Sequence, residues 1–288
     1  MPTTLRTVAA CTALALFLGA CGGVDAPDRD NPWDEGNPDY VPPMALIEDR
    51  PDTSFATGEP DITFRWGGNT PDVTGFSYRL HTSSRDESDT ASEVGWSAWS
   101  PAASVTFESL DEGAHFFEVR AQYPTGAQSK TPDSREFTVD AVKGPALIVQ
   151  PRLARPSPGE RMVVNVVTEG VEDLMLAHVV LSYDASTPDL LNVEEGDMMP
   201  THADDSGGTP IFLSDVDGGV VDISLGLALA DPAGVSGEGS LARLEFRVLR
   251  AGDSQIAFGG ATELRDTRNR VIPGSTYVPA DVRASSRN

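Results

Sequence analysis

Cysteine and positive charge are both scarce in this sequence of 288 residues. Its two cysteines, Cys11 and Cys21, lie near the N-terminus, so no disulfide can staple the rest of the chain. Lysine and arginine together number 21 against 44 acidic residues, which gives a formal net charge of −23. Because such a polyanion repels phosphate backbones, the composition excludes a nucleic-acid-binding protein.

Glycine and proline, in contrast, are abundant. The 27 glycines and 22 prolines favour turn-rich β structure over helical bundles. Hydrophobic residues make up 39% of the chain, which is enough to build folded domains and excludes disorder throughout. The length is typical of about two domains.

The N-terminus carries an apolar run from Val8 to Leu18, after a single positive charge at Arg6. The run is shorter than the ~20 residues that span a bilayer and is typical of a signal-peptide core. It ends in Leu18-Gly19-Ala20-Cys21, which resembles the lipobox of bacterial lipoproteins. The resemblance implies a signal peptide over residues 1–20, cleavage before Cys21 and lipidation of that thiol. An ordinary secretory signal that contains a cysteine is the alternative.

Lipidation would place the protein in the cell envelope, with the membrane contacted through the lipid anchor alone. Gly22 follows Cys21 where aspartate would resemble an inner-membrane retention signal, so the outer membrane is expected in an organism with two membranes. No thiol would then remain as a metal ligand or nucleophile. Residues 21–43 are acidic and rich in proline, a composition that predicts a lipidated, disordered tether.

The fold class predicted for the remainder is all-β, with two β-sandwiches in tandem. Residues 44–142 alternate short apolar runs with turn clusters and should form strands at Ile62–Trp66, Gly75–His81, Ser104–Glu108, Phe116–Gln122 and Glu136–Asp140. The stretch Leu110–Ala121 resembles the penultimate strand of fibronectin type III and related Ig-like modules. In that pattern a tyrosine hydrogen-bonds back to the preceding turn. His115 holds its place here and should make the same bond, and Trp66 should lie in the core.

The second domain, residues 144–285, should contain strands at Ala146–Gln150, Met162–Thr168, Leu176–Tyr183, Leu190–Val193, Ile211–Ser214, Val220–Leu229, Ser240–Leu249 and Gln255–Phe258. Four segments occur in order: Pro158–Glu160, Leu181–Asp184, Leu191–Gly196 and Gly237–Phe246. Their succession resembles the cohesin domain, a nine-stranded jelly roll related to some carbohydrate-binding modules. The resemblance implies a domain without catalysis or cofactor that docks a dockerin-bearing protein, with calcium entering through the partner. The chain departs from the family at Ala185, where proline is usual, and in a wide acidic loop from Asp197 to Asp205.

Candidate binding residues are few. Asp215 and Asp217 alternate before a glycine pair, which is typical of a β-turn and only weakly of a cation site. Trp96 and Trp99 are candidates for stacking on a glycan. Residues 162–242 hold 15 acidic residues and no lysine or arginine, so Asp197, Asp204 and Asp205 are candidates for an acidic docking surface.

No catalytic constellation is present in the sequence. The four histidines lack metal-ligand spacing, and no serine or carboxylate pair stands in a recognisable catalytic pattern. We therefore expect a protein that is not an enzyme and that binds another protein, with a dockerin-bearing partner implied by the resemblance. Carbohydrate binding linked to polysaccharide recognition or breakdown, and a purely structural or adhesive surface role, are the alternatives.

Overall fold

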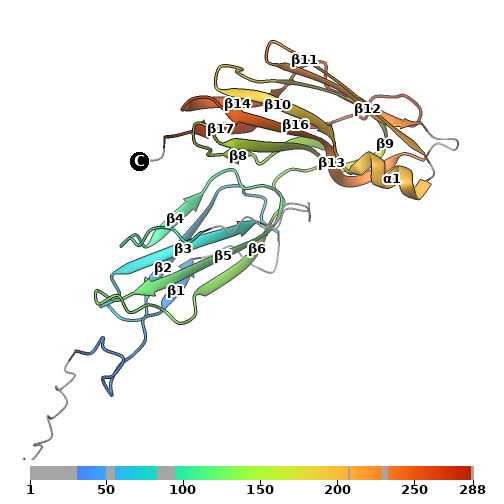
Figure 1. Cartoon of the computed structure of the whole chain (residues 1–288). Coiled ribbons are helices and arrows are strands. Elements are labelled where there is room, and N and C mark those ends of the chain that lie inside the picture. Colours follow the sequence, from blue (N-terminus) through green and yellow to red (C-terminus); the bar gives the residue numbers. More distant parts are fainter. Residues whose placement is uncertain (1–30, 50–55, 83–94, 207, 229–232, 287–288) are drawn as a thin grey trace, which may run out of the picture. The chain divides into compact units, whose positions relative to one another are not determined.

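The computed structural model describes residues 31–49, 56–82, 95–206, 208–228 and 233–286 (Figure 1). The predicted signal peptide and Cys21 lie outside these ranges. Residues 31–40, which belong to the expected tether, form successive turns. The side-chain oxygens of Asn31, Asp34 and Asn37 each accept the amide two residues later, at 3.0, 2.8 and 2.8 Å. Asparagine and aspartate favour such turns because their short side chains can reach that amide.

The described residues form seventeen strands and one helix. Their bounds are β1 (Ala45–Asp49), β2 (Ile62–Gly68), β3 (Gly75–Thr82), β4 (Ser104–Phe107), β5 (Gly113–Gln122), β6 (Asp133–Val139), β7 (Ala146–Gln150), β8 (Leu153–Ala154), β9 (Arg161–Ser182), β10 (Pro188–Glu195), α1 (Met198–Ser206), β11 (Thr209–Asp217), β12 (Val220–Ala228), β13 (Val235–Val248), β14 (Gly252–Phe258), β15 (Glu263–Asp266), β16 (Thr276–Val278) and β17 (Ala280–Ala284). The all-β class is confirmed. None of the helical structure in the described ranges is long and apolar enough to cross a membrane.

The first sandwich packs the sheet β1-β2-β4 against the sheet β3-β5-β6. Alternate residues of β2 point inward, so Ile62, Phe64 and Trp66 are buried while the residues between them are exposed. The ring of Phe64 stacks on that of Phe117 with centroids 4.0 Å apart. Trp66 is 2% exposed and lies in the core, as the sequence predicts.

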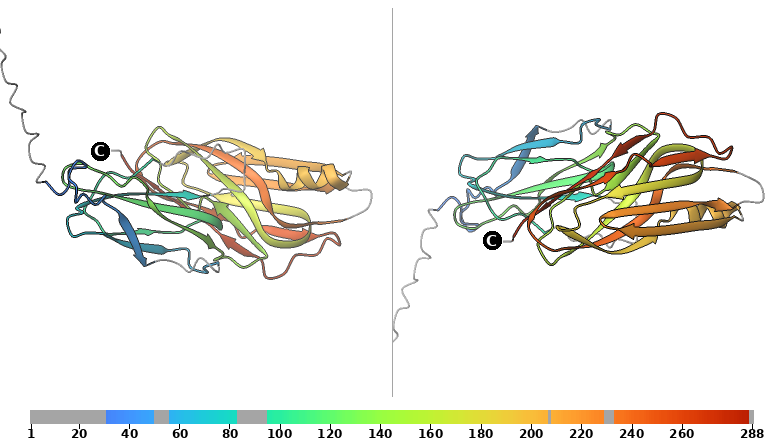
Figure 2. Two further views of the ribbon diagram at one scale, coloured as in Figure 1. Left: turned by 90° about the horizontal axis from the view of Figure 1, so that it is seen from below. Right: turned by 90° about the horizontal axis from the view of Figure 1, so that it is seen from above.

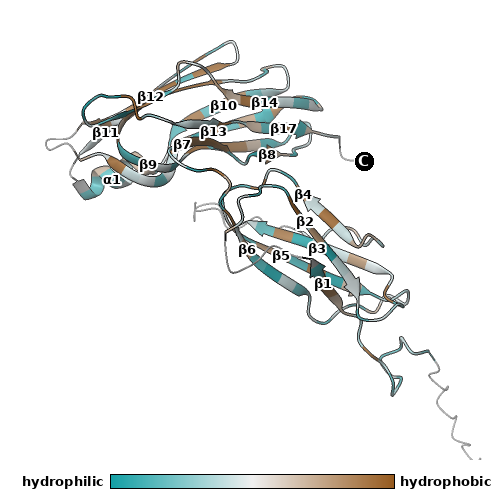
Figure 3. Cartoon of the chain, turned by 180° about the vertical axis from the view of Figure 1, so that it is seen from behind, coloured by the Kyte–Doolittle hydropathy of each residue, from teal (hydrophilic) through white to brown (hydrophobic). Residues whose placement is uncertain are grey.

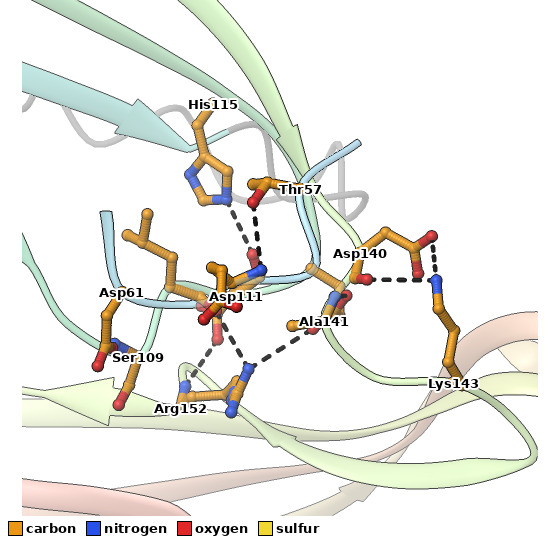
Figure 4. A network of polar contacts seen from close by, with 12 residues as sticks. Thr57, Asp61, Ser109, Asp111, His115, Asp140, Ala141, Lys143 and Arg152 are labelled. Carbon is orange, nitrogen blue, oxygen red and sulfur yellow. Dashed lines mark hydrogen bonds and ion pairs between the residues drawn. The ribbon is translucent and has the colours of Figure 1, made fainter. Parts of the chain in front are cut away.

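His115 is a structural histidine in the first sandwich. Its side chain is buried, and its Nε2–H donates to the carbonyl oxygen of Asp111 in the preceding turn at 2.8 Å, which is the predicted bond (Figure 4). The ring also stacks on Phe137, with centroids 5.2 Å apart. Burial lowers the pKa of His115, so the neutral imidazole is the form that this site favours.

The second sandwich is a jelly roll built around the long strand β9. The first part of β9 pairs with β7 and β13, and the part from Leu174 pairs with β12, β14 and β15. The strand therefore contributes to both layers, and it covers two of the predicted strands, Met162–Thr168 and Leu176–Tyr183. Between them Gly170 and Asp173 both adopt positive φ, at 56°, where the strand changes direction.

One short helix interrupts the β structure. The residues predicted as a wide acidic loop form α1 (Met198–Ser206), because Met198, Met199 and Ala203 are buried and give the segment an apolar side to pack. Asp197 directly precedes α1, and its carbonyl oxygen accepts a hydrogen bond from the Thr201 amide of the helix at 2.9 Å. Oδ1 of Asp197 accepts a hydrogen bond from the Ser240 amide at 3.0 Å, which ties the start of the helix to β13. Figure 2 shows α1 at one end of this sandwich.

Polar contacts join the segment after β4 to the turn after β7 (Figure 4). The Arg152 amide donates to Oδ1 of Asp111 at 2.7 Å, and its guanidinium lies 3.6 Å from the Glu112 carboxylate. Arg155 and Arg283 both donate to Oε2 of Glu108, at 2.9 and 2.6 Å. Three arginines of the second sandwich thus meet three acids of the first. Burial raises the pKa of Asp111 to about 6, although the Arg152 amide and guanidinium act in the opposite direction.

Candidate functional site

The strands β11, β12, β9 and β15 lie side by side in one layer of the second sandwich. Val221, Ile223 and Leu225 of β12 point into the core and are nearly fully buried. Since side chains alternate along a strand, the intervening residues of β12 and their cross-strand partners form the opposite, outer face. We call this surface the outer face. Hydrophobic segments of β11 and β12 can be followed in Figure 3.

Cross-strand pairing arranges the outer face in four rows. Starting from the β11 residue, the rows are Ile211–Gly226–Leu176–Arg265, Leu213–Ser224–His178–Glu263, Asp215–Asp222–Val180 and Asp217–Val220–Ser182–Ala257. The first two rows bring together the large apolar side chains of Ile211 and Leu213 on β11 and Leu176 on β9. The other two rows hold the carboxylates of Asp215 and Asp217 on β11 and Asp222 on β12.

The apolar part of the outer face is unusually exposed for side chains of its size. Leu213 is 65% exposed, Ile211 46% and Leu176 42%. Gly226 lies between Ile211 and Leu176, and a Cβ atom there would stand only 2.4 Å from Cδ2 of Leu176. The side chain of Leu176 thus lies over the glycine and towards β11. We call the group of Leu176, Ile211 and Leu213 on the outer face the apolar ridge.

Charged groups border this apolar ridge. His178 and Asp222 are paired across β9 and β12, with Nε2 of the histidine 2.9 Å from Oδ1 of the aspartate. Arg265 makes two hydrogen bonds to Glu263, at 2.7 and 3.1 Å. That contact holds the pKa of Glu263 below its usual range, and the nearby His178 adds to the effect. An apolar centre with a polar margin is suited to contact with another protein surface.

Asp215 and Asp217, the weak cation candidates, lie on β11 at the end of this face. Gly218 and Gly219 follow them with φ of 56° and 87° and form a two-residue turn into β12. Positive φ at both positions defines the tight turn that best matches the twist of paired strands. Among the residues that the structure describes, no group of three histidines, cysteines or carboxylates is placed to hold a metal ion. The turn itself is formed by the two glycines, and the aspartates belong to the strand before it.

Trp96 and Trp99, the glycan candidates, lie beside β3 of the first sandwich. The guanidinium carbons of Arg79 and Arg120 lie 4.5 and 4.3 Å from the centre of the Trp96 ring, and Arg120 lies 4.7 Å from that of Trp99. Two guanidinium groups therefore lie against the Trp96 ring and compete with a sugar for stacking on it. Burial and the neighbouring Arg79 lower the pKa of Arg120.

The predicted acidic docking surface belongs to α1 and its start. Asp204 and Asp205 are exposed on the helix, whereas Asp197 is exposed but engaged with the Ser240 amide. None of the three lies in the rows of the outer face. The acids on the outer face itself are instead Asp215, Asp217, Asp222 and Glu263.

Comparison with known proteins finds solved structures of similar fold. A non-cellulosomal cohesin from the archaeon Archaeoglobus fulgidus is 20% identical, with 49% of this chain and 91% of that chain covered and a TM-score of 0.41. A cohesin from Clostridium acetobutylicum is 22% identical, with 49% and 90% covered and a TM-score of 0.40. A cohesin–dockerin complex from Clostridium thermocellum contains a chain that is 20% identical, with 49% and 98% covered and a TM-score of 0.39. No protein-family profile and no curated protein matches the sequence.

Sequence reasoning missed the residues that form the apolar ridge. Ile211 and Leu213 fall in a predicted strand, and so does Leu176, but the sequence does not say which side of each strand faces solvent. Gly226 gives a signal in hindsight, because a glycine within an apolar strand indicates close approach by another group.

Proposed function

We propose that this chain is a non-catalytic, lipid-anchored protein of the cell envelope that binds another protein through the outer face. The observation that carries the proposal is the apolar ridge, in which three large apolar side chains, Leu176, Ile211 and Leu213, are exposed together on the outer face. Contiguous exposed apolar side chains with a polar margin are typical of protein interaction sites. The first sandwich serves as a spacer between the anchor and this domain.

The partner proposed is a dockerin-bearing protein. Two observations support this choice: the ordered segments from Pro158 to Phe246 that resemble cohesins, and the description of solved neighbours as cohesins in complex with dockerins. Calcium would enter through the partner, whose loops bind it, and this chain would supply the protein surface alone. An outer-membrane location is proposed for an organism with two membranes, on the basis of Gly22 after Cys21.

The test is capture of purified dockerin modules on the immobilised full chain, in calcium and in chelator. Retention in calcium and release in chelator are expected. Leu213→Asp should abolish retention, because it places a charge at the most exposed part of the apolar ridge. Leu191→Asp is the matched control, since Leu191 is an exposed leucine on β10, which pairs with β13 and not with the four strands of the outer face.

Two outcomes would contradict the proposal. Capture that survives Leu213→Asp would place the partner elsewhere on the chain. No capture of any dockerin module, together with retention on an insoluble polysaccharide that Trp99→Ala abolishes, would favour carbohydrate binding. If the chain neither captures a dockerin module nor is retained on polysaccharide, the structural or adhesive role is favoured.

A further inference from the structure

No strand among the described residues pairs with the second edge of β11, the edge that faces away from β12. All nine residues of β11 pair with β12, from Thr209 opposite Ala228 to Asp217 opposite Val220. Within the described ranges β11 pairs with no other strand. In an antiparallel pair, alternate residues direct their N–H and C=O groups away from the partner. Those groups of β11 have no backbone hydrogen-bond partner in the part of the chain that the structure describes.

This edge lacks most of the features that normally protect an exposed strand. Edge strands are usually guarded by charged side chains, lysine above all, by proline, by a bulge or by a covering segment. The charged residues of β11 are Asp215 and Asp217 alone, Pro210 stands only at its second position, and its pairing with β12 shows no register shift. By contrast, the edge strand β10 carries a register shift between Leu190 and Asn192.

The edge of β3 shows how this protein covers a free strand elsewhere. Its Tyr78 carbonyl accepts the Ser97 amide at 2.8 Å, and the amide of Ser100 donates to the Phe76 carbonyl at 3.0 Å. Residues 97–100 therefore occupy that edge. Among the described residues no backbone hydrogen bond of this kind reaches β11, although α1, which directly precedes it in the chain, lies close to it.

The side chains of β11 define what a pairing strand would need. Ile211, Leu213, Asp215 and Asp217 follow one another along the same side of the strand. The two aspartates are exposed and make no hydrogen bond or ion pair with any residue that the structure describes. Cross-strand neighbours stabilise a sheet when apolar faces apolar and charges are opposite. The matching strand has two basic side chains opposite the aspartates and two apolar ones opposite Leu213 and Ile211.

We propose that the outer edge of β11 accepts an extended segment of a partner protein as an added antiparallel strand. Read from its N-terminus, that segment is basic–x–basic–x–apolar–x–apolar, with the basic residues opposite Asp217 and Asp215. The inference extends the proposed function, on which it rests for the partner being a protein. It differs in the means of binding, because main-chain hydrogen bonds supply the affinity and the alternate side chains supply the specificity.

The experiment uses the full chain and a capped synthetic peptide, Lys-Thr-Lys-Thr-Val-Thr-Val. Binding is measured by fluorescence anisotropy, and amide hydrogen exchange of the protein is followed with and without saturating peptide. We expect slower exchange at alternate amides of residues 209–217 and unchanged exchange in β10. A peptide with alternate amides N-methylated keeps the charge but cannot complete the ladder, so it should not bind.

Charge is tested on both sides of the pairing. Replacing the lysines by glutamate should abolish binding, and the double variant Asp215→Asn/Asp217→Asn should weaken the lysine peptide about threefold to tenfold and reduce its dependence on salt. Both aspartates are exposed, so the variant should unfold at the same temperature as the natural chain.

Several results would overturn the inference: unchanged exchange along β11 at saturation, equal binding of the N-methylated peptide, or tighter binding of the reversed sequence Val-Thr-Val-Thr-Lys-Thr-Lys. The dockerin capture experiment is independent of this one. If the peptide binds but no dockerin module is captured, strand addition at β11 is supported and the dockerin partner is refuted. If dockerin modules are captured but the peptide does not bind, only strand addition at β11 is refuted.

Discussion

Replacing Leu213 by alanine is the most quantitative test of where the protein partner docks. Leu213 is 65% exposed, so docking on the outer face can bury about two thirds of its side chain. Full burial of a leucine contributes ~1.5–3 kcal/mol relative to exposure, and the share available here is therefore about 1–2 kcal/mol. That free energy corresponds to a roughly fivefold to thirtyfold weaker Kd for the Leu213→Ala chain.

The assay is isothermal titration calorimetry of the full chain with a calcium-loaded dockerin module. Leu191→Ala on β10 is the control, because Leu191 is also an exposed leucine, at 36%, but lies outside the outer face. Neither substitution removes a core residue, so the free energy of unfolding should change by no more than about 0.5 kcal/mol in either variant. Equal Kd values for the two variants would refute the assignment of the apolar ridge as the docking surface.

Two further predictions concern Asp111, which contacts Arg152 of the second sandwich, and the lipid anchor expected at Cys21. Burial raises the pKa of Asp111 from 3.8 to about 6. Between these pH values the folded state keeps a proton that the unfolded state has lost. The free energy of unfolding therefore falls as the pH rises through this range, by about 2–3 kcal/mol from this group. In the Asp111→Asn variant the free energy of unfolding, measured in urea from about pH 4 to about pH 7, should no longer show this fall. Asp72→Asn, at an exposed aspartate, is the control and should keep it. An unchanged pH profile in Asp111→Asn would show that burial of Asp111 does not cause the fall. Cys21→Ser should abolish incorporation of radiolabelled palmitate and release the chain from the membrane fraction, and continued labelling would refute lipidation at Cys21.

Strand positions could be predicted where apolar and polar residues alternate. The sequence predicts a strand at Ala146–Gln150, and β7 has those bounds; each of the other expected strands overlaps an observed one. The short strands β8, β15 and β16 have too few residues to show a period and depend on non-local pairing with β17, β9 and β7. Helix α1 was missed because its burial rests on Met198, Met199 and Ala203, which do not form a clear helical stripe.

The candidate site could be predicted only in part, because it depends on which strands become neighbours. The sequence places Leu213 and Leu176 in strands 37 residues apart, but their meeting on the outer face requires the pairing of both with β12. Acid-rich composition drew attention to Asp204 and Asp205, although charge counts contain no information on which acids border an apolar surface. His115 was predicted correctly because its bond to Asp111 is local, spanning four residues.

The two-glycine turn at Gly218 and Gly219 also constrains how the outer face can change by insertion and deletion. Successive residues of a strand point to opposite sides, so a shift of one position in the β11–β12 pairing would move Ile211 and Leu213 off the outer face, to the side on which the half-buried Phe212 now lies. Phe212 and Ser214 would take their places on the outer face. A single inserted residue at this turn is therefore expected to remove Ile211 and Leu213 from the outer face, although the composition of the hairpin hardly changes. Two inserted residues can extend the hairpin and keep these side chains on the outer face.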